Sequence, residues 1–365
     1  MKKQLEGGNP FRYGCVVEDS FYCPRPSLEK QLAGFIRSGQ NVVIHGERRM
    51  GKTSLINAVV RGMRGWRMLY VDLLHVQTVG DVCRRIVSAV RNMERKASLF
   101  EKALKFLPRL RPVMKVDPST GEFGFGLDAR AAENPYAVED VLDMLAKVAA
   151  GGRTVVVFDE FQDILNIRKR LDKQLRSIMQ TQQNLNYILL GSQESMMIEI
   201  FERKKSPFYH FGQLMRLDKI PYEDFREYIS ARLPKDENDK LDGIIKEILS
   251  FTNFHPYYTQ QLSAQVWEMM TYDHLYEGVV SEAISKIVRT HDLDFERLWL
   301  NFNRTDRSIM ISLSKGVNPM QNRQMATSTS FSAIKRLMKA GYIIKVNDYE
   351  IEDPFFREWI LRFCI

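Results

Sequence analysis

The 365-residue sequence has little of several features that mark particular classes of protein. Its only cysteines are Cys15, Cys23, Cys83 and Cys364, whose spacing matches neither a disulfide framework nor a zinc site. No apolar run approaches the ~18 residues that a membrane-spanning helix needs. No apolar segment follows the initial lysines, as it would in a signal peptide. Internal repeats are absent as well. We therefore expect a globular, cytoplasmic protein with free thiols.

Basic residues exceed acidic ones, 53 to 45, which gives a net charge of +8. The excess is spread along the chain and forms no long basic tract. It is compatible with binding of nucleic acid or another polyanion, and equally with a solvated surface of slightly basic character. The length of the chain predicts two or three domains rather than a single small core.

Short apolar runs rich in β-branched residues alternate with helical patterns in the first part of the chain. The expected strands are Asn41–His45, Met68–Leu73, Thr154–Phe158, Tyr187–Leu190 and, more weakly, Leu214–Leu217. The expected helices are Thr53–Met63, Val79–Lys96, Val138–Ala150 and Leu171–Asn184. Most of the apolar runs are continuous, which indicates strands buried on both faces of a parallel sheet. The order predicts a doubly wound α/β domain that binds ligands at the carboxyl ends of its strands.

Three further segments follow other patterns. Residues 108–126 read as an inserted hairpin around the turn sequence DPSTG. Residues 221–300 are helical, with breaks at LPKDEND and TNFHP. Residues 301–365 read as helix, helix and hairpin, the outline of a winged helix. We therefore expect an α/β core over residues 1–220, followed by the helical region and the winged helix.

The sequence HGERRMGKTS, residues 45–54, joins the first expected strand to the first expected helix. In a loop of this pattern, glycines let the backbone N–H groups face phosphate oxygens. Lys52 would supply positive charge to the β- and γ-phosphates, and the Thr53 hydroxyl would be a ligand of Mg²⁺. A glycine-rich turn with an incidental lysine is the alternative. The residues expected to hold the phosphates are Gly46, Glu47, Arg48, Arg49, Met50, Gly51, Lys52, Thr53 and Ser54.

A second motif, TVVVFDEFQD, ends its strand in two carboxylates. Asp159 is expected to hold Mg²⁺, directly or through water, and Glu160 to polarise a water for in-line attack on the γ-phosphate. Two loop acids that only cap a strand are the alternative. The strand Met68–Leu73 lies between the two motifs, as in NTPases that hydrolyse ATP with a catalytic glutamate. On the next strand, Ser192 or Gln193 would sense the γ-phosphate, unless Ser192 only caps the following helix.

The segments GERRMGKTSLI, VVVFDEFQDI and ILLGSQES, with NPFRYG and FYCPRPSLEKQL upstream, resemble the archaeal-type ATPases, a family within the AAA+ and STAND-like NTPases. The resemblance covers nearly the whole chain. It implies a sheet of order 5-1-4-3-2, ATP rather than GTP, and nucleotide held between the core and a helical lid. It also implies that Arg25 belongs to the adenine pocket and that Pro256 packs on the base. An ordinary helix start is the alternative for Pro256.

One departure from the family pattern bears on the rate of hydrolysis. Relatives carry Leu-Tyr-Gly-Arg where this chain reads SPFYHFG, so His210 and Phe211 replace the Gly-Arg pair. No arginine finger can be assigned there, and Arg176 is a weaker candidate for charge neutralisation. Because such an arginine contributes ~10³–10⁵ in rate, its loss predicts slow hydrolysis, which suits a switch better than a motor.

The second helix of the expected winged helix has an apolar and a basic side. The apolar positions expected to face inward are Phe331, Ile334, Leu337 and Met338. The basic positions expected on the other side are Lys335, Arg336 and Lys339. Such a helix could read DNA, but basic side chains are common on solvated faces, and winged helices also bind proteins.

The sequence as a whole therefore predicts an ATP- and Mg²⁺-binding AAA+/STAND-like ATPase that acts as a slow, nucleotide-dependent switch between ATP and ADP states. The alternative is a nucleotide-gated module that binds DNA or protein through the winged helix, with hydrolysis incidental. The partner and the oligomeric state stay open.

Overall fold

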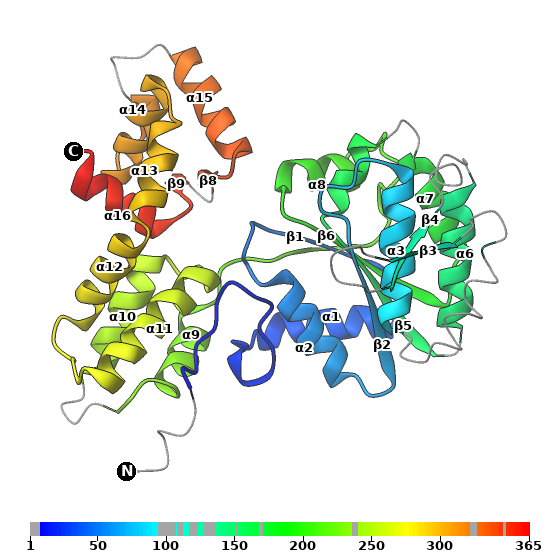
Figure 1. The fold of residues 1–365 in the computed structure, drawn as a ribbon, viewed down its shortest axis with the longest axis horizontal. Coiled ribbons are helices and arrows are strands. Elements are labelled where there is room, and N and C mark those ends of the chain that lie inside the picture. The colour runs from blue at the N-terminus through cyan, green and yellow to red at the C-terminus, as the bar shows by residue number, and fades with distance from the viewer. Residues whose placement is uncertain are drawn as a thin grey trace. The chain divides into compact units, whose positions relative to one another are not determined.

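The protein is described from a computed structural model, over residues 8–93, 107, 112–116, 123–127, 136–150, 152–167, 171–235, 240–321, 327–345 and 348–365. The chain forms two compact units (Figure 1). The sheet unit is Pro24–Asp218, and the helical unit combines Met1–Cys23 with Lys219–Ile365. The sequence predicts an α/β core over residues 1–220. Its end differs by two residues, whereas the first 23 residues group with the helical unit.

The sheet unit alternates strands and helices along the chain. Its strands are β1 Val42–His45, β2 Trp66–Asp72, β3 Pro112–Val116, β4 Phe123–Leu127, β5 Arg153–Asp159, β6 Leu185–Gly191 and β7 Gln213–Arg216. Its helices are α1 Pro26–Arg37, α2 Lys52–Gly62, α3 Val79–Met93, α6 Ala137–Ala149, the 3₁₀ helix η2 Phe161–Asn166, α7 Leu171–Met179 and α8 Glu194–Phe201. Helix α7 ends five residues earlier than expected. The last part of the expected helix Val79–Lys96 lies outside the described residues.

Five strands form one parallel sheet in the order β2-β5-β6-β1-β7. Numbered one to five along the chain, this order is 2-3-4-1-5, so the expected 5-1-4-3-2 arrangement is confirmed. The weakly predicted strand β7 forms the edge beside β1. Strand β6 separates β1 from β5, and all five carboxyl ends lie at the same edge of the sheet, as parallel strands require.

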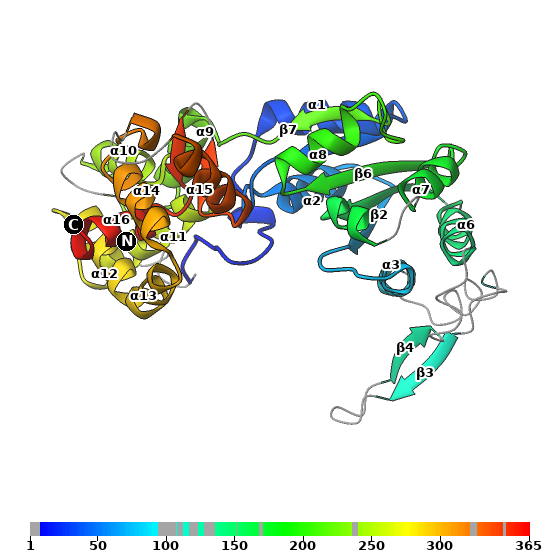
Figure 2. The ribbon, with the colours of Figure 1, turned by 90° about the horizontal axis from the view of Figure 1, so that it is seen from above.

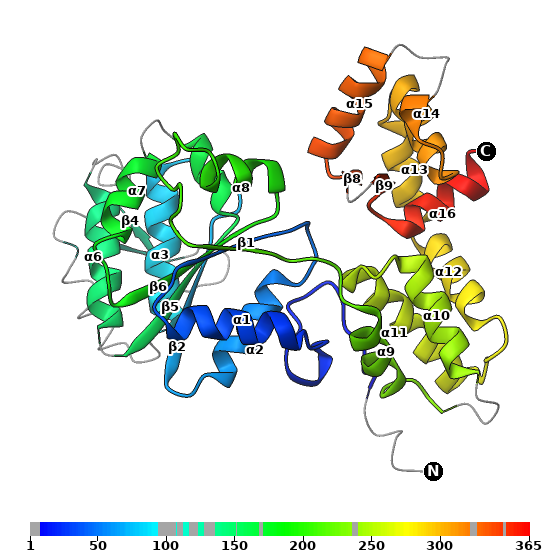
Figure 3. The ribbon, with the colours of Figure 1, turned by 180° about the vertical axis from the view of Figure 1, so that it is seen from behind.

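Helices cover both faces of this sheet (Figures 1 and 3). Alternate residues of a strand point to opposite faces, so Val155 and Val157 of β5 pack with α1 and α2, whereas Val156 and Phe158 pack with α3, α6, α7 and α8. Both cores consist of buried apolar side chains. The continuous apolar runs of the sequence follow from this two-sided burial.

The expected insert forms a separate antiparallel pair, β3 with β4, in which Pro112 lies opposite Leu127 (Figure 2). This confirms the predicted hairpin. Its turn, residues 117–122, lies outside the described part of the chain.

The helical unit consists mainly of helices, with a short hairpin before its last helix. Its elements are the 3₁₀ helix η1 Asp19–Phe21, α9 Tyr222–Ser230, α10 Leu241–Thr252, α11 Pro256–Tyr272, α12 Val279–Thr290, α13 Asp292–Leu300, α14 Arg304–Ser314, the 3₁₀ helix η3 Pro319–Gln321, α15 Thr327–Lys339, β8 Ile343–Lys345, β9 Tyr349–Ile351 and α16 Pro354–Phe363. One hydrophobic core runs through it, and Phe11 and Cys23 of the N-terminal segment belong to that core. Asn9 also donates a hydrogen bond to the Ala264 carbonyl at 3.0 Å. These contacts explain why the N-terminal segment groups with this unit.

Helix α15 faces inward with a different stripe from the one we expected. Ile334 and Leu337 are buried as predicted, but Phe331 is 54% exposed and Met338 is 38% exposed. Ser330 and Ala333 take their places in the core. Positions 330, 333, 334 and 337 follow the helical spacing of one face, and Phe331 and Met338 each lie about 100° further around it.

Among the described residues, none of the helices is both long and apolar enough to cross a lipid bilayer.

Candidate functional site

The loop between β1 and α2 makes a tight turn against Leu217, the residue that follows strand β7. A Cβ atom added to Gly46 would lie 2.7 Å from the Leu217 carbonyl oxygen, so only glycine fits this close approach. Gly51 has φ 83°, in the left-handed region that favours glycine, and helix α2 begins at the next residue. Arg49 also has a positive φ, 61°. The two glycines of the motif are therefore required by the backbone path.

The buried side of the loop is held by Arg25, whereas the loop's own two arginines are exposed. Met50 is buried, and Arg48 and Arg49 are exposed. Arg25, which is only 4% exposed, donates from one guanidinium nitrogen to the Met50 carbonyl at 2.7 Å and from another to the Asp218 carbonyl at 2.9 Å. Arg25 therefore fixes the loop to the chain that follows β7.

Lys52 is buried at the start of α2, where its ammonium group contacts the loop itself. Nζ donates to the Gly46 carbonyl at 2.8 Å and to the Glu47 carbonyl at 2.7 Å. Burial lowers the pKa of Lys52, and the carboxylates of Glu160 and Asp159 act in the opposite direction. The two motifs found in the sequence are thus close enough for their charges to interact.

The Asp159 carboxylate receives hydrogen bonds from two hydroxyl groups. Thr53 Oγ1 donates to Oδ2 at 3.2 Å, and the Tyr70 hydroxyl donates to the same oxygen. Burial raises the pKa of Asp159, although the hydrogen bond from Tyr70 opposes this shift. Burial also raises the pKa of Tyr70, and the Asp159 charge reinforces it, so the phenol stays protonated and remains a donor.

Glu160 follows directly and is held by a second pair of donors. Its φ of 51° places the backbone in the left-handed region, and its N–H donates to Asp159 Oδ1 at 2.8 Å. Ser192 Oγ donates to Glu160 Oε2 at 2.7 Å, and Gln162 Nε2 donates to the same oxygen at 2.5 Å. The N-cap residue of α8 is Gln193, so the alternative that Ser192 caps this helix is wrong.

Arg176 lies away from this group, which corrects our expectation for it. Its guanidinium lies over the Phe211 ring, 4.9 Å from the centroid, and Phe211 is a buried residue just before β7 begins. The amino ends of parallel strands lie at the edge opposite the loop, so Arg176 cannot neutralise charge at the chain's own phosphate loop. Helix α7 returns from the carboxyl end of β5 to the amino end of β6, and Arg176 is in its last turn.

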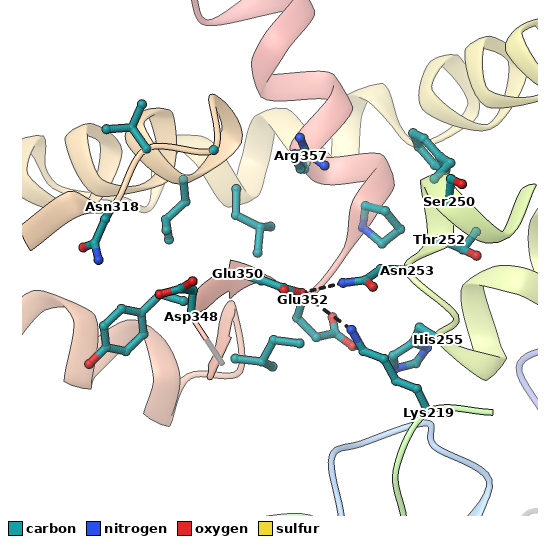
Figure 4. Close-up of a pocket in the computed structure, with 18 of the residues that line it drawn as sticks. Lys219, Ser250, Thr252, Asn253, His255, Asn318, Asp348, Glu350, Glu352 and Arg357 are labelled. Atoms are coloured by element: carbon teal, nitrogen blue, oxygen red, sulfur yellow. Dashed lines mark hydrogen bonds and ion pairs between the residues drawn. The ribbon is translucent and has the colours of Figure 1, made fainter. Parts of the chain in front are cut away.

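Pro256 is the first residue of helix α11, in the helical unit, as the helix-start interpretation expected. The turn before it has two successive positive φ values, at Asn253 (48°) and Phe254 (58°). Asn253 Nδ2 donates to Glu350 Oε2 of strand β9 at 2.7 Å, and the Lys219 ammonium lies 3.6 Å from the same oxygen (Figure 4). A cavity of about 740 Å³ lies between this turn and the hairpin.

Two residues at the carboxyl edge of the sheet were missed in the sequence. Tyr70 was within a predicted strand, and Gln162 is part of the motif FDEFQD. The implied sheet order places β2 beside the carboxylate strand, so a polar residue near the end of β2 could have been proposed. The position of Gln162 depends on β6 and α8, far along the chain, and had no comparable signal.

The strand order and the loop that joins β1 to α2 define the P-loop NTPase fold of the AAA+ type. The family model described as "ATPase domain predominantly from Archaea" matches residues 30–262, more than half of the chain. The chain belongs to this family.

Solved structures share this fold at low sequence identity. A Walker-type ATPase of Pyrococcus abyssi is 14% identical, with TM-score 0.62, over 98% of this chain and 99% of that chain. The ORC2 protein of Aeropyrum pernix, in ADPNP and ADP complexes, is 11% identical, with TM-score 0.51, over 92% and 91%. The ORC1 protein of the same organism, in complex with DNA, is 14% identical, with TM-score 0.50, over 92% and 93%. The comparison with curated proteins returned no match.

Proposed function

We propose that this chain binds ATP with Mg²⁺ at the loop of residues 46–54 and hydrolyses it slowly. The observation that carries the proposal is the 3.2 Å contact between Thr53 Oγ1 at the start of α2 and Asp159 Oδ2 at the end of β5. Two oxygen donors that meet beside a lysine fit Mg²⁺, which prefers oxygen ligands and completes its shell with water and phosphate. Mg²⁺ held by Thr53 and Asp159 would neutralise charge on the phosphates.

The other residues of the site have distinct roles in this proposal. Lys52 Nζ donates to the carbonyls of Gly46 and Glu47 in the loop. When nucleotide occupies the loop, the same ammonium group would donate to phosphate oxygens instead. Glu160 would accept a proton from the attacking water, and Ser192 would orient that carboxylate. Arg25 would hold the loop in shape through the Met50 carbonyl.

Slow hydrolysis is proposed because the position of the family's arginine holds Phe211, whose side chain is buried in the core. Arg176, the other candidate, lies at the opposite edge of the sheet. Steady-state phosphate release by the purified protein at saturating Mg-ATP tests this. We expect less than about one turnover per second, as intrinsic rates without an arginine finger are low. Several turnovers per second would contradict the slow cycle.

We further propose that the helical unit serves as a lid, with Pro256 on the base, and that residues 301–365 form a winged helix. The turn before Pro256 is bonded to strand β9 through Asn253 and Glu350 at 2.7 Å, and Tyr258 donates to Glu352 at 2.6 Å. A change at the turn on nucleotide binding would therefore be transmitted to the hairpin. This supports a switch that alternates between ATP and ADP states.

Glu160→Gln tests the switch, because it should retain ATP but stop the cycle. A pull-down from the native host with this variant and ATP should enrich a partner relative to the ADP-loaded wild type. Equal partner binding with and without ATP would contradict the switch.

The second candidate is a nucleotide-gated binding module that uses the outer face of α15, with hydrolysis incidental. Lys335 and Lys339 are exposed there, and Arg336 pairs with Asp306 at 2.5 Å. The exposed Phe331 and Met338 favour a protein partner, whereas the DNA complex of the ORC1 relative favours DNA. A mobility-shift series against salt separates them, because phosphate contacts give a steep salt dependence. No shift at low salt would exclude DNA.

A further inference from the structure

Gln162 is a buried polar residue that contacts the candidate catalytic glutamate. Its side chain is 1% exposed, and Nε2 donates to Glu160 Oε2 at 2.5 Å. Ser192, at the end of the neighbouring strand, donates to the same oxygen at 2.7 Å. Two donors on one oxygen restrict rotation of the carboxylate. No hydrogen bond joins Glu160 Oε1 to another of the described residues, so that oxygen remains able to accept a proton from water.

The carbonyl oxygen of the Gln162 side chain, Oε1, has no hydrogen bond to a described residue that would offset its burial. Oε1 is buried, and no hydrogen-bond partner for it occurs among the described residues. A buried carbonyl oxygen without a donor destabilises the folded state, and an apolar side chain of similar volume would avoid that penalty. Core packing alone therefore does not explain a glutamine at this position, whereas its hydrogen bond to Glu160 does.

Gly191, the last residue of β6, leaves the space that the Gln162 side chain occupies. A Cβ atom at Gly191 would lie 2.7 Å from Gln162 Oε1 and 2.2 Å from Met197 Sδ. The Glu160 backbone is also constrained, since its φ of 51° is uncommon for a residue with a side chain. Strained backbone of this kind is concentrated at functional sites, where the surrounding structure maintains it.

We propose that Gln162 is a positioning residue for the hydrolytic step. It fixes Glu160 Oε2, together with Ser192, so that Oε1 is directed at the attacking water. This inference rests on the proposed function, in which Glu160 is the general base. Since small displacements of a catalytic group from its working geometry slow a reaction strongly, loss of the Gln162 donor should reduce the rate and leave nucleotide binding intact.

Gln162→Met tests the proposal, because methionine fills a similar volume without a donor or an unpaired oxygen. We expect kcat to fall about 10- to 100-fold, with KM for ATP and Kd for nucleotide within about twofold of wild type. The melting temperature should stay equal or rise, because the buried unpaired oxygen is removed. Gln183→Met, in the exposed turn before β6, is the matched control and should leave all of these quantities unchanged.

A second variant, Gln162→Leu, also removes the amide donor and replaces it with a different apolar shape. It should lose as much activity as Gln162→Met, and wild-type turnover would contradict the proposal. A fall in melting temperature or in nucleotide affinity with Gln162→Met would show a structural role instead. Glu160→Gln distinguishes failure of the positioning role of Gln162 from failure of the proposed ATPase function. If it is inactive while Gln162→Met turns over normally, only the positioning role fails. If it hydrolyses ATP normally, the proposed function fails as well.

Discussion

Asp159 is the residue at which the parts of the site converge. One of its oxygens accepts hydrogen bonds from Thr53 on α2 and from Tyr70 on β2, and the other accepts the Glu160 N–H. The Asp159 carboxylate, which is the proposed Mg²⁺ ligand, is therefore oriented by three donors. Residues that orient a metal ligand commonly contribute 10- to 100-fold to metal affinity.

Tyr70→Phe should weaken the use of Mg²⁺ without disturbing the fold. The substitution removes only the hydroxyl that donates to Asp159. We expect the Mg²⁺ concentration for half-maximal hydrolysis to rise about tenfold, with little change in the maximal rate. A magnesium titration of phosphate release measures this, with Tyr272→Phe at an exposed position as the control. An unchanged titration would show that Tyr70 does not support the metal site.

Asp159→Asn should make the nucleotide-free protein more stable at neutral pH. Burial raises the pKa of Asp159, so the folded state holds this proton more tightly than the unfolded state does. The wild type therefore loses stability as pH rises from the unfolded value of 3.8 through the folded pKa, and the loss persists at pH 7. The neutral amide avoids that loss, and the Tyr70 and Thr53 hydroxyls can accept as well as donate.

Thermal unfolding as a function of pH measures this effect, since one kcal/mol corresponds to about 2 to 4 °C in a chain of this kind. The melting temperature of Asp159→Asn should exceed that of the wild type at pH 7, and the two should converge as pH falls toward 4. A less stable variant at pH 7 would mean that the interaction of Asp159 with Lys52 outweighs its burial.

At the scale of elements, the path of the loop between β1 and α2 depends on Gly46, which lies against Leu217, the residue that follows β7. Gly46→Ala should displace the loop, because the new Cβ would lie 2.7 Å from the Leu217 carbonyl oxygen. That oxygen belongs to the backbone and cannot move away by a side-chain rotation. We expect loss of about 1–3 kcal/mol in stability and at least about tenfold weaker nucleotide binding. Unfolding by denaturant and a nucleotide titration measure the two effects.

Gly34→Ala is the contrasting substitution within α1. A Cβ atom there meets nothing within 4 Å, so the change should stabilise the helix by about 0.5–1 kcal/mol and leave nucleotide binding unaltered. If Gly46→Ala behaved like Gly34→Ala, the close approach to Leu217 would have no consequence.

The strands of the sheet unit could be predicted because burial on both faces leaves continuous apolar runs, as in β5. Their order came from the family resemblance, since apolar runs alone do not specify neighbours. Helix α15 was harder, because Phe331 and Met338 extend the apolar pattern beyond the true inward stripe, and tertiary packing decides which stripe faces inward.

The site residues also fall into those that the sequence predicts and those that it does not. Lys52, Thr53, Asp159 and Glu160 belong to local motifs, and the structure brings them together. Tyr70 and Gln162 could not be found from a motif, since their partners lie on other segments. Arg176 was misplaced although its position just before a parallel strand already indicates the amino edge of the sheet, opposite the phosphate loop.

At the scale of the molecule, the candidate residues are divided between the two units. The phosphate loop and both carboxylates belong to the sheet unit, whereas Pro256 and the hairpin belong to the helical unit, where Asn253 and Glu350 connect them. A nucleotide that contacted both units would couple them, and hydrolysis would then reset that coupling. Only the second step depends on Glu160, the residue that should separate ATP binding from ATP hydrolysis.

A single-turnover experiment tests this central claim most directly. Protein in excess is mixed with γ-labelled ATP and Mg²⁺, and bound nucleotide and released phosphate are followed together for the wild type and Glu160→Gln. We predict equal ATP binding by both proteins, and phosphate release from the variant at least about 100-fold slower. Phosphate release at the same rate from both, or no ATP binding by either, would contradict the account.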